Sequence, residues 1–319
     1  MKDPMKSALS LLLALLVAAA TASAFEVRTY DVPRGARPHD VAPDPRPGGP
    51  VWYTAQGQGA LGRLDPTTGK TEQIALGEGS APHGVIVGPD GAPWVTDGGL
   101  NAVLRIDPVT HAVKRYPLPV ASNVNLNTAT FDKEGRLWFT GQSGWTGRVE
   151  PAGGKVEAWP APRGVGPYGI ATTPAGEVYV ASLAGSYLGH VDRVGGKPVP
   201  INPPTPDAGV RRVWSDSHGR LWVSEWFAGK LGRYDPAARS WRELQLPGAA
   251  PRPYAVWVDE RDVVWLSDFA ADAIVRFDPA SERFERVPGR ASGVRQLLGR
   301  AGEVWGAESG VDRLIVVRH

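Results

Sequence analysis

Apolar and polar positions repeat along the chain with a period near 43 residues. One half of the repeat is a turn of the type Gly-Arg-apolar-acidic-Pro, whose acidic residues stand at positions 65, 107, 150, 192, 235 and 278. The other half is an aromatic residue that follows an apolar one, at Trp52, Trp94, Trp138, Tyr179, Trp222, Trp265 and Trp305. A period of about 40 to 50 residues with several short strands per unit is typical of a β-propeller. Seven aromatic positions therefore predict seven blades.

The second unit illustrates the four strands that we expect in each blade. Its predicted strands are residues 83–87, 93–96, 102–106 and 112–116. Pro89-Asp90-Gly91 is a turn sequence between the first two strands, and the outer strands alternate polar and apolar residues, as half-buried strands do. We interpret the repeated tryptophans as packing between neighbouring blades. The predicted fold class is all-β, a seven-bladed β-propeller with four-stranded blades.

The two ends of the repeat array predict how the ring closes. The last unit has three strands of its own, the third near residues 312–317. The segment Phe25–Val32 resembles the fourth strands of other units, such as residues 112–117. We expect this N-terminal strand to complete the seventh blade, which would also remove an exposed sheet edge. The chain has no cysteine, so closure cannot rely on a disulfide.

Composition adds an expected location and excludes one class of partner. Residues 1–24 combine two lysines, an apolar run at residues 9–20 and the cleavage signal Ala22-Ser23-Ala24, a combination typical of a signal peptide. The apolar run is too short to span a bilayer. We expect residues 25–319 to form a single propeller, monomeric, periplasmic or secreted, and without a membrane span. The net charge is +2, and the basic residues do not gather into a stripe along the sequence, which argues against a nucleic-acid partner.

Counting from the repeated aromatics predicts two rings of side chains at one end of the central channel. The first ring lies eleven residues before the aromatic in five units, with small adjustments for the lengths of the first and last. It consists of His39, His83, Asn127, Tyr168, Arg211, Tyr254 and Arg295. The second ring, three residues after the aromatic, consists of Ala55, Asp97, Gly141, Ser182, Glu225, Asp268 and Glu308. Buried polar groups cost stability unless they are solvated or paired, so a wet, salt-bridged mouth and a functional site are both open interpretations.

One arc of this rim holds the side chains best suited to chemistry. His39 and His83 are on adjacent blades, and Asp97 shares a blade with His83. Glu308 and Arg295 are on the seventh blade, next to the first by closure. An imidazole can transfer protons near neutral pH, and a nearby carboxylate can orient it or bind a divalent cation. This arc is therefore the candidate active site.

Several segments carry a family resemblance. They are Arg37-Pro38-His39, Pro82-His83-Gly84-Val85, Leu137-Trp138-Phe139-Thr140, Gly166-Pro167-Tyr168-Gly169-Ile170 and Leu221-Trp222-Val223-Ser224-Glu225-Trp226. With the repeated Asp-Pro turns, they resemble the streptogramin B lyase family, also called virginiamycin B lyases, over essentially all of residues 25–319. The resemblance implies a lyase that opens a cyclic depsipeptide or lactone by β-elimination, without water and with the help of magnesium.

The resemblance also implies roles for individual residues. His83 corresponds to the general base and His39 to a residue that contacts the substrate. Asp97, fourteen residues after His83, corresponds to a ligand of Mg2+. Ala81 stands where the family has another metal-binding glutamate, and Glu308 of the neighbouring blade is the candidate replacement. The other predicted substrate-binding residues are Arg295, Asn127, Tyr168 and Tyr254.

Two other functions fit the same sequence. A metal-dependent lactone hydrolase of similar architecture would hold a cation in the channel, with Asn127 and Asp268 as candidate ligands. A non-catalytic propeller would bind a ligand, a glycan or a protein at the rim, and the alanine at position 81 fits that interpretation. A fold of this kind does not by itself choose among the three functions.

Overall fold

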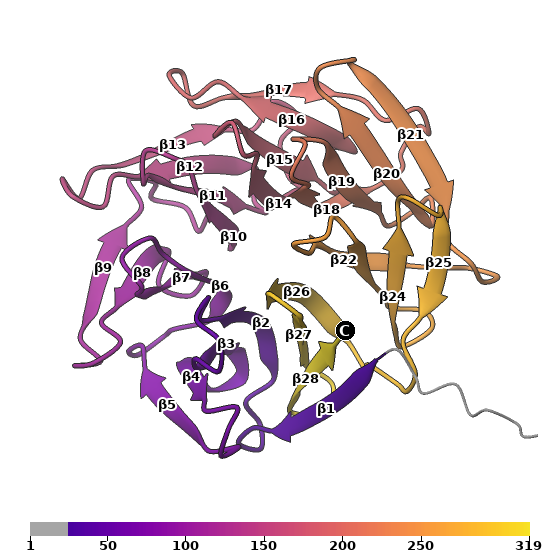
Figure 1. Ribbon diagram of the computed structural model, residues 1–319. Coiled ribbons are helices and arrows are strands. Elements are labelled where there is room, and N and C mark those ends of the chain that lie inside the picture. Colours follow the sequence, from indigo (N-terminus) through magenta and orange to yellow (C-terminus); the bar gives the residue numbers. More distant parts are fainter. Residues whose placement is uncertain (1–24) are drawn as a thin grey trace, which may run out of the picture.

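A computed structural model describes residues 25–319, and their regular structure is β-sheet apart from one 3-10 turn, η1 (Gln56–Gln58). Seven four-stranded sheets stand in a ring, each with one edge strand nearest the centre and the opposite edge strand on the outside (Figure 1). This arrangement confirms the predicted seven-bladed all-β propeller. The predicted signal peptide, residues 1–24, lies outside the described residues. No helix within residues 25–319 has the length and apolar character needed to cross a membrane.

The blades follow one another along the chain, and their strands pair in antiparallel order. Blade 1 consists of β2 (Pro38–Pro43), β3 (Val51–Ala55), β4 (Ala60–Leu64) and β5 (Thr71–Ala75). Blade 2 consists of β6 (Pro82–Val87), β7 (Pro93–Asp97), β8 (Ala102–Ile106) and β9 (Val113–Pro117). Blade 3 consists of β10 (Leu126–Phe131), β11 (Leu137–Gly141), β12 (Trp145–Val149) and β13 (Val156–Pro160). Blade 4 consists of β14 (Pro167–Thr172), β15 (Val178–Ser182), β16 (Tyr187–Val191) and β17 (Pro198–Ile201). Blade 5 consists of β18 (Val210–Ser215), β19 (Leu221–Glu225), β20 (Lys230–Asp235) and β21 (Ser240–Gln245). Blade 6 consists of β22 (Pro253–Val258), β23 (Val264–Asp268), β24 (Ala273–Asp278) and β25 (Arg283–Arg286). Blade 7 consists of β26 (Val294–Arg300), β27 (Glu303–Glu308), β28 (Arg313–Arg318) and β1 (Glu26–Asp31).

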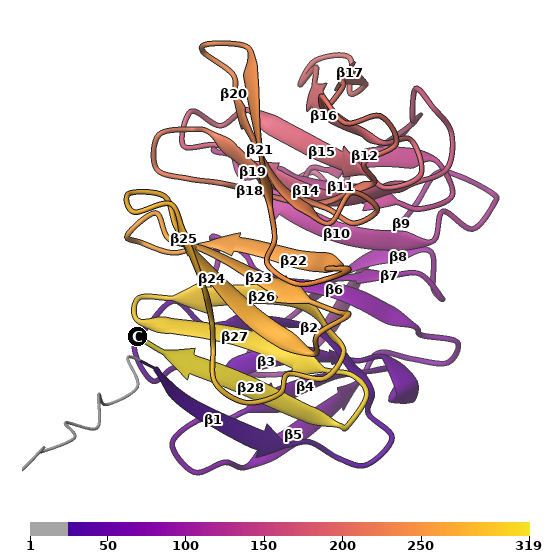
Figure 2. The same ribbon diagram turned by 90° about the vertical axis from the view of Figure 1, so that its right-hand side faces the viewer.

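The seventh blade is closed by the N-terminal strand, as predicted. β1 pairs antiparallel with β28, with Glu26 opposite Arg318, and both strands lie at the same edge of the ring in Figures 1 and 2. Tyr30 of β1 stacks on Trp305 with ring centroids 5.6 Å apart. Its hydroxyl donates a hydrogen bond to the carbonyl of Pro66 in blade 1 at 3.0 Å. The closing strand therefore connects the last blade to the first.

Carboxylates of the tight turns hold the indole N–H groups of the repeated tryptophans. In three blades the tryptophan is at most 1% exposed and donates to the aspartate six residues before it. These pairs are Trp138–Asp132, Trp222–Asp216 and Trp265–Asp259, at 2.7, 3.0 and 2.9 Å. Each aspartate also accepts a backbone N–H of its own turn. The repeated tryptophans and turn aspartates of these blades thus have a structural role.

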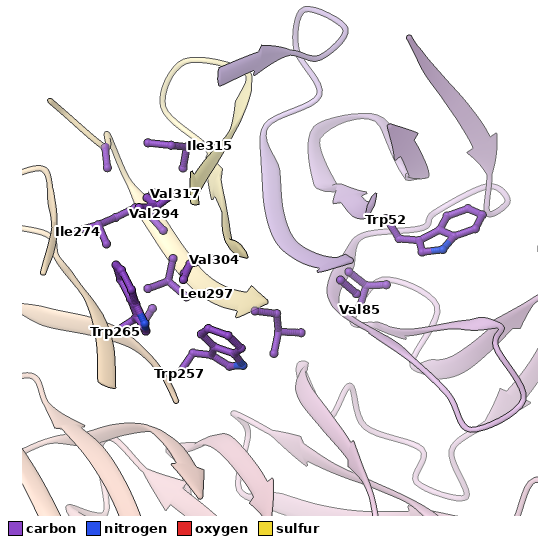
Figure 3. Packing of buried hydrophobic residues seen from close by; sticks show 14 of the residues in the cluster. Trp52, Val85, Trp257, Trp265, Ile274, Val294, Leu297, Val304, Ile315 and Val317 are labelled. Atoms are coloured by element: carbon purple, nitrogen blue, oxygen red, sulfur yellow. The ribbon is translucent and has the colours of Figure 1, made fainter. Parts of the chain in front are cut away.

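Hydrophobic packing is continuous between blades. Figure 3 shows Trp257 and Trp265 of blade 6 beside Leu297 and Val304 of blade 7, and the same buried cluster includes Trp52 of blade 1. A large buried aromatic side chain removes about 150–250 Å² from water, worth roughly 4–6 kcal/mol at about 25 cal/mol per Å² before conformational entropy is subtracted. This packing makes the ring a rigid support for the innermost strands.

Candidate active site at the channel mouth

A β-bulge in the innermost strand of every blade lies where the first ring was predicted. Pairing with the second strand shifts between Pro38 and Val41 in blade 1 and between Pro82 and Gly84 in blade 2. The corresponding shifts elsewhere are Leu126–Ala129, Pro167–Ile170, Val210–Val213, Pro253–Val256 and Val294–Leu297. A bulge re-aims side chains and is frequent beside active sites. Every residue of the predicted first ring lies within one of these shifts.

Hydroxyl groups two residues after the repeated aromatics hold the bulges in place. Thr54 accepts the N–H of Asp40 in its own blade at 3.0 Å and donates to the carbonyl of His83 in the next blade at 2.8 Å. The same bridge runs from Thr96 to Asn127, from Thr140 to Tyr168 and from Ser224 to Tyr254. The backbone of these ring residues is therefore tied to the preceding blade.

His39 and His83 lie against each other at the mouth of the channel. Their ring centroids are 3.9 Å apart, and the two residues are 6% and 7% exposed. With Arg37, Tyr168 and Arg295 they line a hollow of about 540 Å³. Packing of blade 2 directly against blade 1 thus brings the two imidazoles together at one end of the channel.

A buried ion pair orients His39. Its Nδ1 atom lies 2.8 Å from Oδ1 of Asp40, and Nη2 of Arg212 donates to the same oxygen at 3.3 Å. Asp40 is 1% and Arg212 is 4% exposed, so charges from blades 1 and 5 meet inside the channel. Removing one partner of such a pair leaves an uncompensated buried charge, at a cost of about 3–5 kcal/mol.

Arg212 also connects to His83, through two neutral side chains. Nη1 of Arg212 donates to the hydroxyl of Thr128, which donates to Oδ1 of Asn127 at 2.6 Å. Nδ2 of Asn127 lies 3.3 Å from Nε2 of His83. The other ring nitrogen of His83, Nδ1, is buried and has no hydrogen-bond partner within residues 25–319. One guanidinium therefore anchors the surroundings of both imidazoles.

The other side of the rim is aromatic and cationic. The hydroxyls of Tyr168 and Tyr254 are hydrogen-bonded to each other, and Arg211 donates to that of Tyr168 at 3.0 Å. The Arg211 guanidinium lies 3.5 Å from the ring centroid of Tyr254, and that of Arg295 lies 5.8 Å from it. With Arg212, three guanidiniums gather around few carboxylates. Such a mouth favours a ligand with anionic or carbonyl oxygens.

Burial keeps both imidazoles neutral near pH 7. It lowers the pKa of His39 below its usual 6.5, although the carboxylate of Asp40 opposes the shift. Burial, with the charges of His39 and Arg212, holds the pKa of His83 well below 6.5. Burial also raises the pKa of Tyr168 to about 12, so its phenol stays protonated. Neutral imidazole is the form that a general base requires.

The two carboxylates predicted as metal ligands cap loops. Asp97 is fully buried and accepts the backbone N–H of Ala81 at 3.0 Å. Glu308 is also fully buried, accepts the N–H of Ser292 at 2.9 Å and pairs with Arg313 at 3.2 Å. In both blades the N–H belongs to the residue sixteen positions earlier. These contacts give the carboxylates a structural role in their own blades.

The residues at the mouth do not fit a magnesium ion. In the described part of the chain, three side chains offer a cluster of potential ligand atoms, His39, Asp40 and His83, all within 4.8 Å of one another. The single carboxylate is already paired with Arg212. Magnesium prefers oxygen ligands, which imidazoles do not offer. The two capping carboxylates do not belong to this cluster, so the geometry gives no support to their predicted role as ligands.

Asp268, considered above as a cation ligand in a lactone hydrolase, is a loop cap of the same kind. It accepts the N–H of Arg252 at 2.9 Å and that of Ala270 at 3.1 Å. Asn127, the other candidate ligand, is hydrogen-bonded to Thr128 and lies against His83. Asp268 therefore holds a loop, whereas Asn127 contacts a histidine at the channel mouth.

Counting along the sequence missed the second residue of several bulges. Asp40, Thr128, Arg212 and Gln296 each follow a first-ring residue directly, and three of the four are buried. Gln296 accepts the N–H of Val41 across the boundary between blades 7 and 1 at 3.0 Å. The available signal was a pair of consecutive polar residues in an otherwise apolar strand, a break in alternation that a bulge produces.

Comparison with known proteins agrees with this architecture. The sequence model of the virginiamycin B lyase family matches residues 17–277. Selenomethionine-substituted virginiamycin B lyase from Staphylococcus aureus has a similar structure, with a TM-score of 0.84 at 19% identity over 92% of this chain and 99% of that chain. A catalytically inactive virginiamycin B lyase from the same organism, with quinupristin, gives a TM-score of 0.83 at 20% identity over 92% and 99% of the two chains.

The same propeller architecture also occurs in a protein that binds a peptide. YCF48 bound to D1 peptide gives a TM-score of 0.71 at 16% identity over 92% of this chain and 96% of that chain. At such identities, likeness of structure shows the fold alone. No curated protein matched the sequence.

Proposed function

The chain belongs to the virginiamycin B lyase family, and from that premise we propose that it opens a cyclic depsipeptide or lactone by β-elimination at the channel mouth. An imidazole of the histidine pair removes the proton on Cα. The electron pair of that C–H bond becomes the second bond between Cα and Cβ. The Cβ–O bond of the ester breaks, and the oxygen leaves as a carboxylate. No water enters the product.

The observation that carries this proposal is the contact of two neutral imidazoles that line the hollow. His39 and His83 touch with ring centroids 3.9 Å apart, and burial lowers the pKa of both. A positioned general base contributes about 10²–10⁴-fold to a rate. Because the two rings share one hollow with Arg295, a proton acceptor and a positive charge are available to one bound substrate.

Guanidiniums supply the positive charge in this account. The site does not fit magnesium, so no step is assigned to a metal. Arg295 reaches the hollow, and its Nε donates to the hydroxyl of Ser309 at 3.3 Å. A guanidinium has several N–H donors and stays charged at every working pH. Arg295 can therefore bind the carbonyl whose oxygen gains charge in the transition state, or the carboxylate that leaves.

The test is the mass of the product. The protein of residues 25–319 is incubated with a streptogramin B depsipeptide, once with magnesium and once with EDTA. We expect ring opening without a change of mass, at similar rates in both reactions. A gain of one water would indicate hydrolysis and contradict elimination, and loss of activity in EDTA would contradict the metal-free account.

A second candidate function, binding without chemistry, is favoured by the aromatic side of the rim. The Arg211 guanidinium lies 4.6 Å from the ring centroids of both Tyr168 and Trp226, and stacked aromatic and guanidinium groups bind planar ligands well. Calorimetric titration with the same depsipeptide distinguishes the two functions. Heat of binding without any product would support a binding propeller.

We also propose that the protein is exported and that cleavage follows Ala24. Phe25 would then be the first residue of the mature chain, where it is 8% exposed and packs edge-on against Trp265 at 5.9 Å. Cleavage there leaves β1 intact for pairing with β28. N-terminal sequencing of the protein recovered from the periplasm or medium tests the site, and a chain that begins at any residue other than Phe25 would contradict it.

A further inference from the structure

The side chains that line the hollow at the channel mouth include two arginines and no carboxylate. Arg37 belongs to the loop before blade 1, and Arg295 belongs to the inner strand of blade 7. No acidic side chain within residues 25–319 forms an ion pair with either guanidinium, whereas the buried Arg212 is paired with Asp40. The hollow therefore presents two positive charges to a ligand.

Arg37 has a backbone conformation that an arginine rarely adopts. Its φ is +46°, in the left-handed region that disfavours residues with a Cβ atom. In blades 5 and 7 the residue two positions before the first ring is also left-handed, and there it is a glycine, Gly209 or Gly293. Strained backbone of this kind is concentrated at ligand-binding and active sites. The arginine at position 37 is therefore a candidate for a role of its side chain in binding.

Two neighbouring segments hold Arg37 in this conformation. Asp312 of blade 7 accepts its backbone N–H at 2.7 Å and that of Gly35 at 2.8 Å. A Cβ atom added to Gly57 would lie 2.3 Å from the carbonyl oxygen of Gly35 and 3.3 Å from Cδ of Arg37. The chain at Gly57 thus packs directly against this loop and against the aliphatic stem of the arginine. The guanidinium is exposed, but the backbone that carries it is fixed.

Arg295 is positioned by its surroundings on blades 6 and 7. Its guanidinium lies 5.3 Å from the ring centroid of Phe269, and its Nε donates to the hydroxyl of Ser309 at 3.3 Å. That hydroxyl donates to the carbonyl of Gly293 at 3.0 Å. The Nη groups of Arg295 donate to no group of the described chain. They remain available to a carboxylate, which can accept two parallel N–H bonds from one guanidinium.

Three side-chain amides line the same hollow. They belong to Gln56, Asn125 and Gln142, and none of these amide groups has a hydrogen bond in the part of the chain that the structure describes. Asn125 is a second residue other than glycine in the left-handed region, with φ +52°. An amide both donates and accepts, so it can pair with the N–H and C=O groups of a peptide. The hollow thus combines groups for a carboxylate with groups for a peptide backbone.

We propose that this hollow is specific for a peptide or depsipeptide that carries a free carboxylate. Arg37 and Arg295 bind the carboxylate, and the three amides bind the peptide groups beside it. The inference rests on the proposed function for the identity of its ligand, because ring opening converts a neutral ester into a carboxylate at this site. The opened product is therefore a ligand of the hollow and competes with the cyclic substrate.

Calorimetric titration with two matched probes tests this specificity without turnover. The first probe is a streptogramin B depsipeptide whose ring ester has been hydrolysed chemically, and the second is the methyl ester of that acid, which lacks the negative charge. We expect the acid to bind at least about tenfold more tightly than the methyl ester. Added salt should weaken binding of the acid and leave that of the methyl ester unchanged. Equal affinities of the two probes would overturn the inference.

Substitutions assign the preference to the two arginines. Arg37→Gln and Arg295→Gln should each reduce the affinity for the acid toward that for the methyl ester. Arg239→Gln is the matched control, because Arg239 is exposed in an outer turn of blade 5, is also left-handed with φ +50°, and changes the net charge equally. A loss of affinity in Arg239→Gln as large as in the other two variants would overturn the inference, since it would show a general charge effect.

Arg37→Gly separates binding from folding. Glycine adopts the left-handed conformation without strain, so we expect a Tm no lower than that of the unchanged protein, together with weaker binding of the acid. A lower Tm with unchanged affinity would show a structural role and overturn the inference. Preferential binding of the acid without any elimination would reject the proposed function and retain the carboxylate site. Elimination with equal binding of the two probes would do the reverse.

Discussion

Arg212 is a single side chain that is 4% exposed, yet its hydrogen bonds connect it indirectly to both His39 and His83. Through Asp40 it orients His39, and through Thr128 and Asn127 it orients His83. The donor-only chemistry of a guanidinium gives the network its direction. A lysine at this position would have a single nitrogen and could not hold both branches in the same fixed geometry.

The substitution Asp40→Asn tests this network. An amide cannot compensate the charge of Arg212, so we expect a loss of roughly 3–5 kcal/mol in unfolding free energy. Asp40 raises the pKa of His39 against the effect of burial, so its removal should lower the pKa of His39 further, as measured by NMR titration of the His39 ring. Asp65→Asn, in an outer turn of the same blade, is the control and should leave the titration of His39 in place. An unchanged titration of His39 in Asp40→Asn would argue against the coupling.

Glu225 is a second buried residue with a measurable consequence. Its carboxyl is fully buried and neither oxygen has a hydrogen-bond partner in the described chain. Burial, reinforced by Glu243, raises its pKa to about 8. Between the unfolded value near 4.5 and about 8, the folded state holds one more proton than the unfolded state. Stability therefore falls as pH rises through this window.

The substitution Glu225→Gln should remove that dependence. We expect the Tm of the variant to exceed that of the unchanged protein by an amount that grows from pH 5 to about pH 8 and then levels off. Thermal unfolding in a series of buffers measures it. Glu78→Gln, at an exposed glutamate, is the control. A Tm difference that does not vary with pH would show that Glu225 is ionised throughout.

The inner strand and its bulge are the elements that make the site. The period of the sequence predicted the strands to within one residue in blade 2, since apolar spacing and turn residues are local signals. The period also predicted the first-ring residues, because corresponding positions of equal repeats lie at the same height along the central channel. Asp40 and Arg212 were missed because a bulge adds a residue that repeat counting skips. The capping role of Asp97 and Glu308 was missed because spacing does not determine where a side chain turns.

Thr96→Val tests the bridge between neighbouring elements. Valine keeps the shape but leaves the carbonyl of Asn127 without the hydroxyl that now contacts it. We expect a loss of about 1–3 kcal/mol in unfolding free energy. We also expect a lower kcat, since Asn127 orients His83. Thr96→Ser retains the hydroxyl and should resemble the unchanged protein. Equal activity of the valine and serine variants would contradict a positioning role.

At the scale of the whole molecule, closure by β1 brings the first and seventh blades together. The loop that follows β1 is held by Asp312, which accepts the N–H of Gly35 at 2.8 Å and that of Arg37 at 2.7 Å. This contact fixes the chain two residues before His39. The same closure places Arg295 in the hollow with the histidines. The site therefore depends on the ring being shut.

Removing residues 25–31 should open the ring. The variant loses the stacking of Tyr30 on Trp305 and exposes the edge of β28, which invites association between chains. We expect a lower Tm and larger species in size-exclusion chromatography. The protein of residues 25–319 is the matched control, and a peptide of residues 25–32 added in trans should restore part of the Tm. A shortened chain that elutes like the protein of residues 25–319 and has an unchanged Tm would contradict closure by β1.

We propose that the histidine pair breaks a cyclic ester without adding water and without a metal. The most direct measurement is the reaction of residues 25–319 with a streptogramin B depsipeptide in oxygen-18 water containing EDTA, with the product analysed by mass spectrometry. The account predicts a ring-opened product that contains a new carbon–carbon double bond and no oxygen-18. A product that carries one oxygen-18 atom would contradict it.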